Sequence, residues 1–125
     1  MKELTKAEEQ IMQILWQLEK AFVNDILDQF PEPKPAYNTV STIVRILERK
    51  GFVGHIAFGK THQYHPMIKK QDYTRHLFKG MLSGYFSNSM QQMVSFFTRE
   101  KNMSLEELEE IKQIIDSEIN KKEDQ

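Results

Sequence analysis

The sequence predicts a mainly helical α+β fold, with three helices and a β-hairpin in an N-terminal domain and further helices after it. Three observations favour this prediction. Apolar residues recur at helical spacing between Thr5 and Lys50, the pattern changes to alternation after Gly51, and helical spacing returns from Asp72. We therefore expect one domain over residues 1–70 and a helical region over residues 71–125 with a frayed tail.

The first helix is expected to begin at Thr5-Lys6-Ala7-Glu8. In this capping box the Thr5 hydroxyl accepts from the amide of the third helical residue, and the Glu8 carboxylate reaches back to the cap. A second, shorter amphipathic segment runs from Phe22 to Phe30. It ends at Pro31-Glu32-Pro33-Lys34-Pro35, because proline removes amide donors and restricts the backbone.

A third helix is predicted from about Pro35 to Lys50, with Gly51 placed for a left-handed C-terminal cap. Its apolar side is formed by Val40, Ile43, Val44 and Leu47. The opposite side is short, polar and basic, and carries Asn38, Ser41, Thr42, Arg45 and Arg49.

Two strands are expected at residues 52–57 and 61–65, joined by Phe58-Gly59-Lys60, in which glycine supplies the backbone angles of a hairpin turn. Pro66 ends the second strand because it cannot donate to the ladder. Three helices followed by a basic hairpin is the element order of a winged helix-turn-helix domain.

The net charge of −1 is unevenly distributed. Residues 1–33 carry three lysines and seven acidic residues, whereas residues 34–70 carry seven Lys or Arg and one acidic residue, Glu48. The remainder carries seven basic and ten acidic residues. Because the positive window coincides with the third helix and the hairpin, we favour a surface that meets a polyanion over an ordinary solvated face.

The outer side of the third helix suits the major groove of DNA, where short amides, hydroxyls and the arginine fork read base edges. An ordinary exposed helix would be richer in Glu and Lys. Tyr37 and the helix N-terminus are placed for a phosphate, and Lys60 at the hairpin tip for the backbone or the minor groove. The predicted DNA contacts are Tyr37, Asn38, Thr39, Ser41, Thr42, Arg45, Arg49 and Lys60.

The C-terminal region is too apolar for a solvated tail, and Ser104-Leu105-Glu106-Glu107 is a second capping box that opens its last helix. Because the chain is too small to bury these apolar stripes internally, we expect a homodimer. The Met and Phe cluster between Phe78 and Phe97 could instead line a small-molecule pocket. The predicted dimerisation residues are Leu77, Met81, Met93, Phe97, Leu105, Leu108, Ile111 and Ile115.

Several classes of site are not expected. The chain has no cysteine, which removes disulfides and thiolate zinc sites and fits a reducing compartment. His62 and His65 are three apart in a strand and point to opposite faces, and neither they nor His55 and His76 form a metal-ligand set. We also expect no cofactor, no enzymatic activity and no membrane insertion, and therefore a cytoplasmic protein.

Three stretches of the sequence together resemble one known family. The first is Leu4-Thr5-Lys6-Ala7-Glu8 with Ile11, Met12 and Trp16. The second is Tyr37-Asn38-Thr39-Val40, continued by Thr42-Ile43 and Leu47-Glu48-Arg49-Lys50-Gly51. The third is Gly59-Lys60 with Tyr64 and Pro66. They are similar to the opening helix, the recognition helix and the wing of the BlaI/MecI/CopY family of penicillinase-type repressors, over nearly the whole chain.

The resemblance implies a homodimer that binds a palindromic double-stranded DNA operator and represses genes for a response to cell-wall antibiotics or copper. Copper sensing through thiolates is excluded because cysteine is absent. In the β-lactam branch a sensor protease system leads to cleavage in a C-terminal helix between asparagine and phenylalanine. Phe96-Phe97 aligns with that bond, without the asparagine.

We therefore predict a sequence-specific transcriptional repressor. Each dimer would present two third helices to successive major grooves, about 34 Å apart. Two alternatives stay open at this point: a winged-helix adaptor that binds protein, and a ligand-sensing repressor with a pocket in its C-terminal helices.

Overall fold

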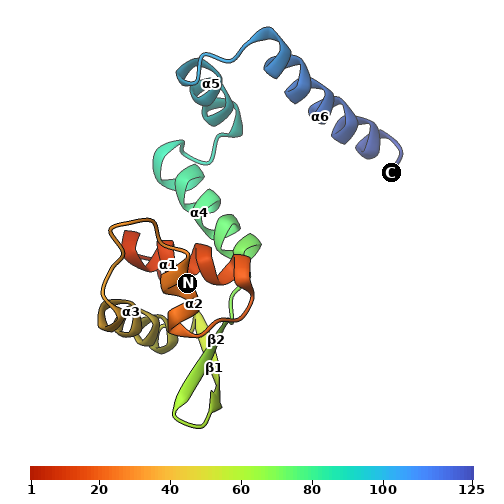
Figure 1. Cartoon of the computed structure of the whole chain (residues 1–125). Coiled ribbons are helices and arrows are strands. Elements are labelled where there is room, and N and C mark those ends of the chain that lie inside the picture. The colour runs from red at the N-terminus through yellow and green to blue at the C-terminus, as the bar shows by residue number, and fades with distance from the viewer. The chain divides into compact units, whose positions relative to one another are not determined.

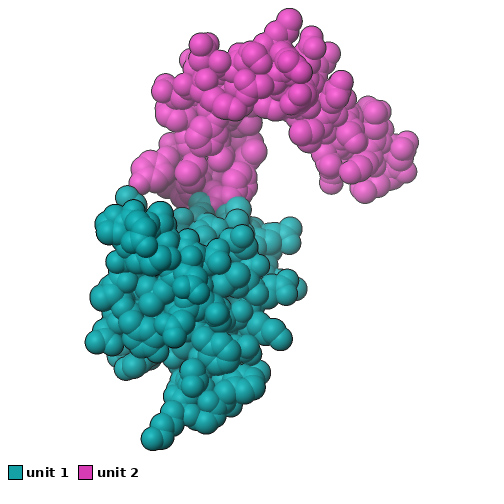
Figure 2. Space-filling model, in the orientation of Figure 1, with its two compact units in different colours: residues 1–77 teal, residues 78–125 magenta.

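The computed structural model describes residues 1–125, which divide into two compact units, residues 1–77 and residues 78–125 (Figure 2). The first unit extends beyond the predicted boundary at residue 70. The reason is Tyr73, which is buried in the N-terminal core together with Phe52, their rings meeting edge to face at 5.7 Å. The start of the C-terminal region is therefore part of the first unit.

The first unit has the predicted order of three helices and an antiparallel hairpin, which projects from the helices (Figure 1). A mainly helical α+β fold is confirmed. The elements are α1 (Lys6–Leu18), α2 (Val23–Asp28), α3 (Tyr37–Arg49), β1 (Val53–Phe58) and β2 (Thr61–Pro66).

The ends of α1 and α3 follow from local sequence. Thr5 caps α1 in the predicted capping box. At the C-terminal end of α3, Gly51 adopts φ 85°, its amide donates to the carbonyl of Glu48, and the amide of Phe52 donates to the carbonyl of Leu47. This pair of bonds is a Schellman cap, which needs a left-handed residue at the glycine position. It turns the chain sharply from α3 into β1.

The start of α3 differs from the prediction. The helix begins at Tyr37, with Ala36 as an extended N-cap residue, rather than at Pro35. Proline restricts the residue before it to extended conformations, and three prolines lie close together here, so the chain enters the helix only after the last of them.

Apolar side chains of all three helices and both strands form one core. It is made by the inward stripes of α1 and α3, and α2 closes it. Its fully buried large side chains are Ile11, Met12, Leu15, Ile26, Val40, Val44, Leu47 and Phe52.

The hairpin has a shorter turn than predicted. β1 and β2 pair from Val53 opposite Pro66 to Phe58 opposite Thr61, so only Gly59 and Lys60 lie in the turn. Gly59 has φ 62°, as two-residue hairpin turns require. A third segment joins the sheet, which the sequence pattern does not reveal: Ala21, between α1 and α2, exchanges two backbone hydrogen bonds with Tyr64, at 2.9 and 2.8 Å.

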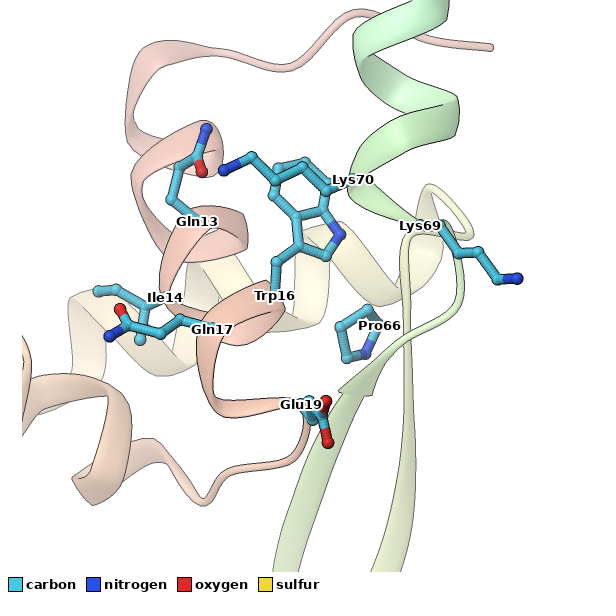
Figure 3. Close-up of a pocket in the computed structure, with 8 residues that line it drawn as sticks. All are labelled: Gln13, Ile14, Trp16, Gln17, Glu19, Pro66, Lys69 and Lys70. Atoms are coloured by element: carbon cyan, nitrogen blue, oxygen red, sulfur yellow. The ribbon is translucent and has the colours of Figure 1, made fainter.

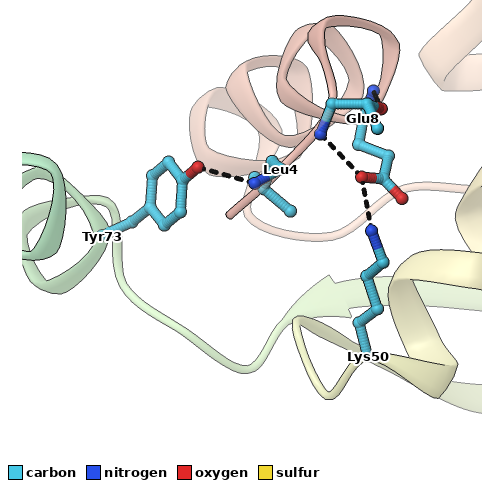
Figure 4. A network of polar contacts seen from close by, with 5 residues as sticks. Leu4, Glu8, Lys50 and Tyr73 are labelled. Carbon is cyan, nitrogen blue, oxygen red and sulfur yellow. Dashed lines mark hydrogen bonds and ion pairs between the residues drawn. The ribbon is translucent and has the colours of Figure 1, made fainter. Parts of the chain in front are cut away.

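Two polar contacts tie the N-terminus to distant elements (Figure 4). The Glu8 carboxylate accepts from the amide of Thr5 and from the ammonium of Lys50, both at 2.8 Å. The Tyr73 hydroxyl accepts from the amide of Leu4 at 2.9 Å. Glu8 and Lys50 link the first turn of α1 to the C-terminal cap of α3, although 42 positions separate them.

The C-terminal region contains α4 (Lys70–Tyr85), which begins in the first unit, followed by α5 (Met90–Glu100) and α6 (Leu105–Glu123). Ser104 forms the predicted capping box of α6. α6 continues to Glu123, so the helix extends into the tail that the sequence analysis expects to be frayed. Lys121 and Lys122 in its last turn stabilise the negative end of the helix dipole. No helix of the chain combines the length and apolar character required to cross a membrane.

Lys50→Met should lower the free energy of unfolding by about 1–3 kcal/mol at neutral pH, because it leaves the buried carboxylate of Glu8 without its charged partner. Methionine retains most of the aliphatic stem, so packing changes little. Urea denaturation followed by circular dichroism measures the decrease. Lys121→Met breaks the exposed pair with Glu118 and should cause no measurable change; an equal decrease there would contradict the assignment.

The effect of Lys50→Met should also depend on pH. Burial raises the pKa of Glu8, but hydrogen bonds from Lys50 and Thr5 outweigh it and hold the pKa below its ordinary value of 4.5. A carboxyl with a lowered folded pKa stabilises the protein above its unfolded pKa, and this stabilisation is lost as pH falls through the folded pKa. The difference between wild type and variant should therefore shrink below about pH 4.5.

Candidate nucleic-acid interface

The exposed side of α3 carries most of the predicted DNA contacts. Tyr37 is 48% exposed, and the other exposed members on this helix are Asn38, Thr39, Thr42, Arg45 and Arg49. None of these residues is acidic. An uncharged or basic helix surface of this kind can donate and accept at base edges and attract phosphates.

The prediction that Ser41 lies on the exposed side is wrong. Ser41 is only 7% exposed, and its hydroxyl accepts a hydrogen bond from the Arg45 guanidinium at 3.2 Å. The spacing Val40, Ser41, Val44, Leu47 follows one helical stripe, and this spacing could have identified Ser41 as an inward residue. Its position makes it a partner of Arg45 instead of a residue that can reach a base.

Two lysines of the predicted positive window make hydrogen bonds within the chain, Lys34 at the surface and Lys50 partly buried. The Lys34 ammonium donates to the carbonyl oxygens of Leu27, Asp28 and Phe30 at 3.1, 3.2 and 3.0 Å, and so caps the C-terminal end of α2. Lys50 pairs with the α1 carboxylate described above. Both lysines therefore link elements of the first unit, and Lys50 is the one whose charge is paired with a carboxylate.

The hairpin places Lys60, which is exposed, in its two-residue turn. On the face that contains Tyr64, the rings of His55 and His62 stack at 4.0 Å and 7°, and His55 Nδ1 contacts the Glu48 carboxylate. This contact joins β1 to the last turns of α3. No three His, Asp or Glu side chains of the chain gather as a metal site would need.

A groove lies between α3 and the hairpin, which we call the helix–wing groove. Its volume is about 300 Å³, and Tyr37, Ser41 and Arg45 line one wall while Lys60, His62 and Tyr64 line the other. Tyr64 is 4% exposed, and burial first and the nearby Glu48 charge second raise the pKa of its hydroxyl. That hydroxyl is therefore protonated at neutral pH and can act as a donor.

A second pocket of about 650 Å³ lies elsewhere on the first unit, and its lining residues come from the second half of α1, the end of β2 and the start of α4 (Figure 3). The indole Nε1 of Trp16, in its wall, donates to the carbonyl of Ile68 at 2.8 Å. Trp16 thereby anchors the segment that leads into α4. None of the predicted DNA contacts lines this pocket.

The model of the penicillinase repressor family matches residues 4–117. The chain belongs to that family. Its membership confirms the resemblance inferred from the sequence and makes the chain a DNA-binding transcriptional repressor rather than an enzyme.

Individual penicillinase repressor relatives are distant but cover the chain well. The methicillin resistance regulatory protein MecI of Staphylococcus aureus (strain N315) is 25% identical over 114 residues, which are 90% of this chain and 93% of MecI. The penicillinase repressor of Bacillus licheniformis is 24% identical over 121 residues, covering 96% of this chain and 94% of the relative.

The solved DNA-binding domain of the repressor BlaI supports the fold. It matches with a TM-score of 0.50 and 25% identity, covering 58% of this chain and 94% of that domain. The winged helix-turn-helix predicted from the element order is therefore confirmed.

The C-terminal helices of this family member leave large apolar side chains uncovered within one chain. Leu105 is 74% exposed, and Ile114, which the sequence analysis did not select, is 64% exposed. Ile111 is half-buried, and Met93 is buried within the single chain. The other predicted dimerisation residues are exposed: Leu77, Met81, Phe97, Leu108 and Ile115.

Proposed function

We propose that two copies of this chain bind a two-fold related DNA operator in the cytoplasm and repress transcription by occupying it. The observation that best supports this proposal is the exposed side of α3, which presents short polar and basic side chains next to a hairpin with a lysine in its turn. A helix of this kind fits the major groove, and two of them demand an operator with matching symmetry.

Base recognition is assigned to Asn38, Thr39 and Thr42. They are exposed in the first turns of α3, the part of a recognition helix that reaches base edges most readily. Tyr37 and the free amides of the first turn are placed for a phosphate. In this proposal the residues at the start of α3 read bases, and the cationic residues add affinity without sequence preference.

Dimerisation is assigned to the C-terminal helices. Several large apolar residues of α6 are exposed in the single chain, which favours burial against another protein surface. Ile114, Ile115 and Ile119 line one apolar surface of that helix. A second copy is the proposed partner, since the operator symmetry requires one.

A sensor protease is the proposed source of induction, on the strength of the family resemblance alone. The Phe96-Phe97 bond lies within α5, and both rings pack with Phe86 at 5.6 and 6.0 Å. Cleavage there would require α5 to unwind. Mass spectrometry of the chain from cells exposed to a β-lactam tests this partner, and an intact chain under full induction would remove it.

Asn38→Ala should weaken binding to the preferred operator by about 1–3 kcal/mol and leave binding to a scrambled duplex nearly unchanged, because the amide reads a base. The operator is first selected by the wild-type protein from random duplexes, and fluorescence anisotropy gives both affinities. Gln13→Ala removes an exposed amide from α1 and serves as the control.

Equal affinity of wild type and Asn38→Ala for the selected operator would contradict the assignment of the reading face. A wild-type affinity that is weak and insensitive to salt would favour the adaptor alternative, since neutralising several phosphates makes binding fall steeply with salt.

Ile115→Asp should convert the dimer into monomers at micromolar concentration, because a carboxylate would have to be buried in the apolar contact. Sedimentation velocity measures the change, and operator affinity should fall roughly tenfold or more with it. Ser117→Asp places the same charge on a polar position of α6 and should leave the dimer intact. Dimers that survive Ile115→Asp would disprove this contact.

A further inference from the structure

The helix–wing groove brings two cationic side chains together from different elements. Arg45 comes from the middle of α3, and Lys60 comes from the hairpin turn on the opposite wall. No carboxylate is among the residues that line the groove, and neither cation has an ion-pair partner in the chain. Two unpaired cations that face a common space create a strong local attraction for an anion.

Arg45 is held toward this groove instead of extending freely. Its Nη2 donates to the Ser41 hydroxyl one turn earlier in α3, at 3.2 Å, and Ser41 is itself buried. This bond draws the guanidinium back along the helix toward the groove. An arginine that read a guanine would instead need both fork donors to point away from the helix into the major groove.

The nearest acidic residue on α3 is engaged elsewhere. Glu48 contacts His55 on β1, and the His55 ring is stacked on His62. The carboxylate therefore makes no ion pair with Arg45, although its charge acts on Tyr64 in the groove wall. Stacking also fixes the orientation of the His62 ring in the groove wall.

The groove supplies neutral donors as well as charge. The Tyr64 hydroxyl, protonated as argued above, and the Tyr37 hydroxyl both belong to lining residues. A tetrahedral phosphodiester needs several donors that converge from different directions, and arginine, lysine and phenol hydroxyls meet that need. The volume of about 300 Å³ is ample for one such group.

We infer that the helix–wing groove holds one phosphate of the DNA backbone, with Arg45 and Lys60 as its charged ligands and Ser41 as the positioning residue for Arg45. This inference rests on the proposed function and refines it. The sequence predicts that Arg45 reads a base, whereas this inference makes Arg45 a phosphate contact. Such a contact adds affinity and fixes the register on DNA, but it does not discriminate between base pairs.

The test uses the full-length protein and a set of operator duplexes, each with one phosphate replaced by an uncharged methylphosphonate. We expect one replacement per half-site to weaken wild-type binding about tenfold, the typical effect of removing a charge-assisted hydrogen bond. Arg45→Ala and Lys60→Ala should each be less sensitive to that same replacement than wild type, because each variant keeps only one of the two charged ligands. Each should also reduce the slope of log affinity against log salt by about 0.9 for every phosphate that the variant no longer neutralises.

Two variants separate positioning from folding and charge. Ser41→Ala keeps Arg45 and fills nearly the same volume, so it should weaken the methylphosphonate effect only partly and leave the salt slope nearly unchanged. Lys6→Ala removes a positive charge from the exposed start of α1, and it should respond to every methylphosphonate as wild type does. Circular dichroism confirms that each variant is folded.

The outcomes are distinguishable. Suppose that wild type binds the operator, but Arg45→Ala is as sensitive as wild type to every methylphosphonate, or no longer discriminates the bases at a single operator position. Arg45 then reads a base, and the inference is overturned while the proposed function stands. If wild type binds no duplex, both fail.

Discussion

The orientation of α3 depends on one buried carboxylate. Glu8 accepts from Thr5 and from Lys50, so one side chain completes the cap of α1 and holds the C-terminal end of α3. The charge is stabilised because both partners donate to it within a nearly dry environment, where unpaired carboxylates are strongly disfavoured. The placement of α3 within the first unit thus depends on a residue that is not among the predicted DNA contacts.

The hairpin is oriented by the next contacts along the chain. The Schellman cap at Gly51 sets the direction of β1, the buried ring of Phe52 fixes its depth, and the exchange of hydrogen bonds between Ala21 and Tyr64 attaches β2 to the segment before α2. Helix and hairpin are therefore two parts of one rigid surface. The groove between them exists because both walls are anchored independently to the same core.

Local chemistry is predictable from the sequence, and long-range pairing is not. The capping boxes at Thr5 and Ser104, the glycine cap of α3 and the hairpin all depend on residues within a few positions of one another. Lys34 and Lys50 resemble surface charges in the sequence, because nothing local shows that one binds carbonyls of α2 and the other a carboxylate of α1.

The extension of the first unit by Tyr73 and the burial of Met93 likewise depend on packing between elements, whereas the inward position of Ser41 follows from its helical spacing. Most of the predicted contact residues on α3 are exposed as expected, but which of them contact bases and which contact phosphates cannot be inferred without the structure.

The attachment of the hairpin to the core affects the entropy of DNA binding. Since the buried ring of Tyr64 and its backbone bridge to Ala21 attach β2 to the core, this part of the strand has little conformational entropy left to lose when DNA binds. The entropy cost of association would then fall mainly on the exposed side chains of α3 and of the hairpin turn.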